Sequence, residues 1–120
     1  MCNFQTLYYN NDFGYVVLCL HCNNIQIGYG NILITFKETE FNSFRYWLRQ
    51  IEENQFVDAG STEYVAKSVM VPTPCEGVKL LLSQKELNEF NIMLDTADSE
   101  MQSQQMMKLF NAPGNMNDAV

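Results

Sequence analysis

Residues 32–48 read Ile-Leu-Ile-Thr-Phe-Lys-Glu-Thr-Glu-Phe-Asn-Ser-Phe-Arg-Tyr-Trp-Leu, and residues 78–94 read Val-Lys-Leu-Leu-Leu-Ser-Gln-Lys-Glu-Leu-Asn-Glu-Phe-Asn-Ile-Met-Leu. In both stretches an apolar strand pattern gives way to apolar positions three and four residues apart, the period of an amphipathic helix. An offset of 46 residues (86 − 40) aligns Glu40 with Glu86. The same offset aligns Phe44 with Phe90 and Leu48 with Leu94. We therefore expect two related units, although two amphipathic helices on similar sheets can also converge on one pattern.

Each of these strands has a partner upstream, so each unit is expected to contain a hairpin. In the first unit, residues 25–27 alternate in polarity and the Gly-Tyr-Gly-Asn turn at 28–31 returns the chain into residues 32–36. In the second unit, residues 64–71 are rich in β-branched side chains and end at a Pro-Thr-Pro sequence, which removes backbone donors. Residues 4–9 and 15–18 predict one further hairpin at the start of the chain.

A hairpin with one helix leaves much of its sheet uncovered, so the two units are expected to pack together. The sequence thus predicts one α+β domain over residues 1–110, with two layers and a mainly antiparallel sheet. Its units span about residues 15–54 and 64–100, and residues 111–120 have the composition of a tail. The apolar residues of segment 98–110 leave the earlier stripe, which fits a separate turn or a helix that faces a partner.

Composition excludes several classes of partner. The chain has 7 basic and 14 acidic side chains, for a net charge of −7. Such a field repels phosphate backbones and anionic membrane surfaces, so we expect no nucleic-acid partner and no membrane partner. The first residues resemble no secretory signal, and no apolar run reaches the roughly 20 residues of a membrane span. A cytoplasmic location is expected, in which cysteines are thiols or metal ligands rather than disulfides.

The sharpest local motif is Cys19-Leu20-His21-Cys22, between two predicted strands. Two thiolates at this spacing can bind one tetrahedral ion, which is half of a zinc site. The remaining ligands would come from among Cys2, Cys75 and His21, and their spacing does not choose between them. Ordinary reduced cysteines, packed as small apolar side chains, are the competing interpretation.

No motif names a reaction, so no catalytic residue and no organic cofactor is assigned. Serine-elbow, His-Glu-x-x-His and phosphate-loop motifs are all absent from the sequence. A thiol-dependent redox protein or small enzyme using Cys19, Cys22 and His21 is the alternative from another class. That alternative requires a cysteine at a helix N-terminus, whereas this pair lies between strands.

The methionines at positions 93, 101, 106 and 107 fit either a core or an adaptable binding stripe. A protein partner or self-association, through a helix or a sheet edge, is therefore expected.

The segment from Cys19 to Phe44 resembles a small bacterial family, found mainly in Bacteroidetes, that is classed as a domain of unknown function. The resemblance is carried by Cys-x-x-Cys, Ile25-x-Ile27, Gly30-Asn31 and Glu40-Phe41-x-x-Phe44, in about the first half of the chain. It implies a short cytosolic protein and brings no activity. The function expected from the sequence is a small non-enzymatic binding or structural module, with zinc at Cys19 and Cys22 as the candidate stabilising ion.

Overall fold

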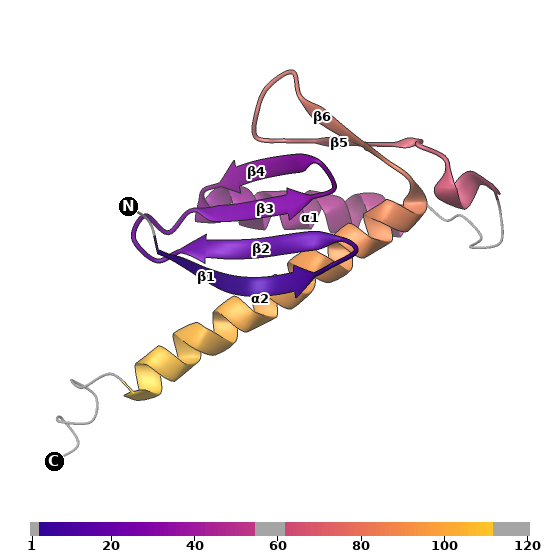
Figure 1. Cartoon of the computed structure of the whole chain (residues 1–120). Coiled ribbons are helices and arrows are strands. Elements are labelled where there is room, and N and C mark those ends of the chain that lie inside the picture. Colours follow the sequence, from indigo (N-terminus) through magenta and orange to yellow (C-terminus); the bar gives the residue numbers. More distant parts are fainter. Residues whose placement is uncertain (1–2, 55–61, 112–120) are drawn as a thin grey trace, which may run out of the picture.

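The computed structural model describes residues 3–54 and 62–111, which form two antiparallel sheets and two α-helices (Figure 1). The α+β class and the mainly antiparallel sheet predicted from the sequence are thereby confirmed. In chain order the elements are β1 (Phe4–Asn10), β2 (Gly14–Cys19), β3 (Ile25–Tyr29), β4 (Ile32–Phe36), α1 (Glu38–Asn54), the 3-10 turn η1 (Thr62–Val65), β5 (Val69–Pro72), β6 (Lys79–Leu82) and α2 (Gln84–Asn111).

Strands β1 to β4 form a meander in which each strand pairs with the next. The register aligns apolar residues in rows across the sheet, such as Leu18 opposite Ile25 and Ile25 opposite Phe36. A two-residue turn joins β3 to β4, and its first residue, Gly30, has a φ of 58°, where a side chain would be strained. These rows build one apolar face, which has to be covered.

Both helices lie on that apolar face (Figure 1). Helix α1 packs Phe41, Phe44 and Leu48 against the sheet, as its three-and-four spacing predicts. Helix α2 crosses the same face diagonally, and its C-terminal end projects beyond the sheet. In the described residues, no helix combines the length and apolar character that crossing a bilayer demands. The buried residues of α2 are Gln84, Leu87, Phe90, Asn91, Met93, Leu94, Ala97, Asp98 and Met101, together with the preceding Ser83.

The two hairpin-helix segments share details at the 46-residue offset. Helix α1 begins at Glu38 and α2 at Gln84, which is 84 − 38 = 46 residues later. The Glu40 carboxylate accepts the backbone N–H of Lys37 at 2.8 Å, and Glu86 accepts that of Ser83 at 2.9 Å. Both helix starts thus share a bond from a backbone N–H to the glutamate three residues later, and at α2 the Ser83 hydroxyl makes it reciprocal by accepting the Glu86 N–H. Duplication itself stays a prediction.

Two segments differ from the sequence expectation. Residues 62–65 form η1 instead of the strand expected from residue 64, and β5 starts at Val69. The amide of Asn88 donates to the Tyr64 hydroxyl at 3.3 Å, so a tertiary contact with α2 holds this turn against its local β preference. Segment 98–110 continues α2 without a break. Most of the expected tail, residues 112–120, lies outside the described residues.

Replacing Ser83 with Ala should destabilise the protein by about 1 kcal/mol, because the Ser83 hydroxyl accepts the Glu86 N–H at 3.1 Å. Urea denaturation followed by circular dichroism measures this loss. Ser99→Ala is the matched control, since Ser99 is exposed within α2 and caps nothing, and it should be neutral or slightly stabilising. Equal effects of the two substitutions would contradict the capping role.

Candidate functional site

The Cys19-Leu20-His21-Cys22 motif forms the turn between β2 and β3. Three backbone bonds hold it: Cys19 N–H to Asn24 O at 2.8 Å, Asn23 N–H to Cys19 O at 2.9 Å, and Leu20 N–H to Asn3 O at 2.8 Å. The N–H of Cys22 points at Cys19 Sγ, 3.3 Å away. Asn23 follows with a φ of 62°, a left-handed conformation that asparagine tolerates better than most residues. The turn is thus a defined structure with a donor aimed at one sulfur.

The structure distributes the other candidate ligands unevenly. Cys19 is buried, with 1% of its surface exposed, while His21 and Cys22 are exposed. Cys75 lies in the β5–β6 loop, beside β4, which is two strands away from β2. Cys2 lies outside the described residues. Within residues 3–54 and 62–111, no three His, Cys, Asp or Glu side chains gather as a metal-binding group.

The setting of the cysteine pair bears on the thiol-redox alternative. Cys19 ends a strand and Cys22 precedes one, whereas α1 begins at Glu38 and α2 at Gln84. Helix N-termini lower thiol pKa values because their unpaired N–H groups favour the thiolate. Neither described α-helix begins at the pair, so the helix-terminus setting that the thiol-redox alternative requires is not found in the described residues.

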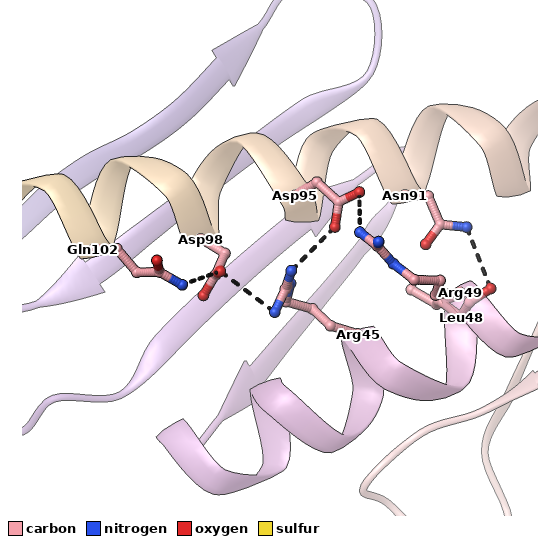
Figure 2. A network of polar contacts seen from close by, with 7 residues as sticks. All are labelled: Arg45, Leu48, Arg49, Asn91, Asp95, Asp98 and Gln102. Atoms are coloured by element: carbon pink, nitrogen blue, oxygen red, sulfur yellow. Dashed lines mark hydrogen bonds and ion pairs between the residues drawn. The ribbon is translucent and has the colours of Figure 1, made fainter.

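A network of charges joins the two helices (Figure 2). Arg45 of α1 lies between Asp95 and Asp98 of α2, at 3.1 Å and 3.5 Å, and Arg49 reaches Asp95 at 2.6 Å. The Asn91 amide donates to Leu48 O at 3.3 Å. Each side chain is engaged in joining α1 to α2, which is a structural role.

Two further ionisable groups lie near α2 without forming a catalytic pair. The Tyr29 hydroxyl donates to Glu89 Oε1 at 3.1 Å, and burial together with the Glu89 charge raises the pKa of Tyr29. At the C-terminal end of α1, burial and the nearby Asp95 carboxylate raise the pKa of Glu52. Tyr29 therefore stays a protonated donor, and Glu52 is a carboxylate held at some cost to folding.

A hollow separates the four-stranded sheet from the β5–β6 hairpin. It has two adjoining parts, of about 330 Å³ between α1 and the end of β5 and about 450 Å³ between β4 and β6. Glu40, Thr73 and Pro74 border both parts. In the described chain, β4 pairs with β3 alone, so its outer edge faces this hollow. The walls are mainly apolar and carry no cluster of acids, bases or nucleophiles.

The C-terminal end of α2 carries the most concentrated exposed apolar group. Four side chains within five residues are 58–72% exposed, although each is large and apolar. These residues belong to the segment whose apolar positions leave the earlier stripe, and this segment is the end of α2 that projects beyond the sheet (Figure 1). We call this group the α2 tip; it consists of Met106, Met107, Leu109 and Phe110.

Fold and surface together define a small two-layer α+β protein with an apolar helix tip. Residues 1–115 match a family described as "Family of unknown function (DUF6686)", and the chain belongs to that family. The expected membership in a family of unknown function is confirmed; its bacterial distribution stays an expectation. No curated protein matches the chain, and no solved structure does.

Replacing Arg45 with Met should destabilise the fold by about 2 kcal/mol, because Asp98, with 11% of its side chain exposed, loses a charged partner. The matched control is Arg49→Met, which breaks a more exposed pair and should cost clearly less. Urea denaturation compares the two variants. Adding Asp98→Asn to Arg45→Met should restore part of the loss, and equal losses in the two single variants would contradict this assignment.

Replacing Glu52 with Gln should make the protein more stable at pH 7 than the parent. The raised pKa of Glu52 means that folding favours its neutral form, so this group's stabilising contribution is present at low pH. That contribution is lost as pH rises through the folded-state pKa, whereas glutamine stays neutral throughout. The urea midpoints of the two proteins should be equal at pH 3, and at pH 7 the Glu52→Gln variant should have the higher midpoint. Parallel midpoints would contradict the assignment.

Proposed function

We propose that this protein is a non-enzymatic interaction module that forms a dimer of two copies through the α2 tip. The observation that carries the proposal is the exposure of four large apolar side chains at the end of an otherwise well-packed helix. Apolar patches of this kind on soluble proteins mark contact surfaces. The mainly apolar hollow and the α1–α2 charge network offer no arrangement of acid, base and nucleophile that favours an enzyme instead.

The described part of the chain does not bury the tip, because this end of α2 points away from the sheet (Figure 1). Met106 lies nine residues after Ala97 (106 − 97), which is two and a half turns at 3.6 residues per turn. Phe110 lies twenty residues after Phe90 (110 − 90), about five and a half turns. Since Ala97 and Phe90 pack against the body, Met106 and Phe110 face roughly the opposite side. Nothing in residues 3–54 and 62–111 covers them, which leaves the surface open to another molecule.

The scarcity of charge at the tip allows a second copy to cover it. The chain carries a net charge of −7, so two copies repel each other over most of their surfaces. Between Gln102 and Phe110, the single charged residue is Lys108. It lies seven residues after Met101 (108 − 101), almost two turns, and therefore shares the side of the helix that faces the body. Two tips can meet without bringing carboxylates together.

The size of the tip sets the expected strength of the contact. Four side chains at this exposure offer on the order of 400–500 Å² per copy, about half of the ~800 Å² per partner in a standard interface. Small interfaces belong to transient complexes. We therefore expect a dimer that forms in the micromolar range and dissociates on dilution.

The test is sedimentation of the full chain between about 1 and 300 μM, a range that brackets micromolar affinity. The parent should shift from monomer to dimer, and the double variant Met106→Gln with Phe110→Gln should raise the dissociation constant at least about tenfold, because it removes the apolar contact. Leu81→Gln is the matched control, since Leu81 is also exposed and apolar but lies on β6. A parent that stays monomeric, or a control that weakens the dimer equally, would overturn the proposal.

A further inference from the structure

The outer edge of β4 presents backbone groups that the sheet does not use. The Gly30 N–H donates to Phe13 O at 3.4 Å, so Gly30 bonds toward the β2 side of β3. Bonding alternates along a strand, so the preceding residue, Tyr29, bonds to its β4 partner, Ile32, as is usual for the pair that flanks a two-residue turn. Every second residue of β4 therefore bonds to β3, and the residues between them direct N–H and C=O away from the sheet. These outward residues are Leu33 and Thr35.

The hollow beside β4 runs along this edge. Its part of about 450 Å³ is bordered by the consecutive residues 32–35 of β4 and, across from them, by residues 78–80 at the start of β6. Successive side chains of a strand point to opposite faces, so a hollow that touches each residue in turn follows the strand's edge. Among the described strands, β6 pairs with β5 alone, so a second open edge lies across the hollow. Both parts of the hollow fall within the about 300–1,000 Å³ of ligand-binding sites.

An extended polypeptide is the ligand whose chemistry matches these edges. Its backbone offers N–H and C=O groups in alternation, which is what an open strand edge can pair with. A second folded copy would bring a whole sheet behind its own β4, and the β5–β6 hairpin stands across that approach (Figure 1). A single extended segment needs no more room than one strand.

The face of α1 that borders the hollow attracts positive charge. Glu40, Ser43 and Trp47 follow one another at spacings of three and four, so they share this face. Glu40 borders both parts of the hollow, and its bond to the Lys37 N–H uses one of its two carboxylate oxygens. The Trp47 ring is exposed, and the face of an indole attracts cations. The net charge of −7 adds a long-range attraction for basic partners.

The opposite side of the hollow favours apolar side chains. Leu33 alternates with the half-buried Ile34 and so lies on the face of β4 away from the helices, where it is exposed. Val78, at the start of β6, is exposed as well. Lys79 alternates with the buried Leu80 and therefore lies on the face of β6 away from the core. Its ammonium group would repel basic side chains there and tolerates apolar ones.

We propose that the hollow binds one extended segment of a partner protein, added as a strand to β4, with basic side chains toward α1 and apolar side chains on the other face. Residues 55–61 and 112–120 of this chain contain no lysine or arginine, so they do not match this chemistry. The hollow lies beside the strands that precede α2, whereas the α2 tip is at the helix's far end (Figure 1). This interaction is therefore separate from the proposed dimer.

The test is isothermal titration calorimetry of the full chain with a synthetic peptide of about eight residues, long enough for one strand, in which arginine alternates with valine. Binding should saturate below about 1 mM. A peptide of the same composition, with all its arginines before its valines, keeps the charge and loses the alternation. It should bind at least about tenfold more weakly, because its basic and apolar side chains no longer separate onto two faces.

A matched pair of aromatic variants locates the peptide. Trp47→Ala should weaken binding about fivefold, because it removes the ring that the basic side chains contact. Tyr46→Ala is the control, since Tyr46 is the adjacent residue and is 60% exposed against 56% for Trp47, but it does not border the hollow. Glu40→Gln should also weaken binding, whereas Glu38→Gln removes the same charge at the same end of α1 and should have less effect.

Backbone pairing is tested without depending on a variant that folds. Two versions of the alternating peptide carry methyl groups on the backbone nitrogens of either the valines or the arginines, which removes the donors of one edge. At least one version should bind about tenfold more weakly. In the protein, Thr35→Pro should weaken binding because it removes the outward N–H, whereas Thr35→Val keeps that N–H and should bind as the parent does. Circular dichroism shows whether both variants keep the fold.

Several results would overturn the proposal: no saturation up to about 1 mM, equal binding of the alternating and block peptides, equal effects of Trp47→Ala and Tyr46→Ala, or two methylated peptides that bind like the parent peptide. Sedimentation with the peptide separates the two surfaces. The peptide should leave the dimer intact and should bind the Met106→Gln, Phe110→Gln variant as tightly as the parent. A peptide that dissociates the dimer would place a second copy in the hollow, and loss of binding in that variant would place the peptide at the α2 tip. Either result would contradict the proposal.

Discussion

Phe90 lies where the sheet and both helices meet, and the fold depends on the contacts made there. Its ring is 4.7 Å from that of Tyr29 on β3 and 5.8 Å from that of Phe44 on α1, in tilted and edge-to-face arrangements. Phe44 in turn contacts Phe36 of β4 at 4.9 Å. Four rings thus connect one sheet, one helix that follows it and one helix from the second half of the chain. Aromatic contacts of this kind add to the free energy of burial.

This cluster also explains why the fold could be predicted so far from sequence. Phe44 and Phe90 recur at the spacing of buried helix positions, and Phe36 falls on the buried side of an alternating strand. Periodicity reports which residues are buried, so strands, helices and the α+β class followed from it. The start of α2 also depends on local bonds, because Ser83 and Glu86 satisfy each other's backbone donors.

Features that depend on tertiary contacts could not be predicted. The turn at Thr62–Val65 is held by a side chain 24 residues away, from Asn88 to Tyr64. The contacts of Arg45 with Asp95 and Asp98 join residues about 50 positions apart, which no local pattern encodes. The cysteine pair and the α2 tip differ in the same respect, since one depends on local spacing and the other on the arrangement of the whole fold. Cys19 and Cys22 were identified by spacing, whereas the outward direction of Met106 and Phe110 became visible once α2 was seen to continue past the sheet.

The gap between β4 and the β5–β6 hairpin has a consequence for aggregation. An unpaired edge such as that of β4 is a template on which strands of other molecules can add, and Leu33 on this strand is exposed and apolar. The hairpin stands across this edge, and Pro72 and Pro74, which cannot donate a backbone hydrogen bond, lie on its border. Loss of the hairpin would uncover the edge, so β5 and β6 protect the molecule from uncontrolled strand pairing as well as extending its core.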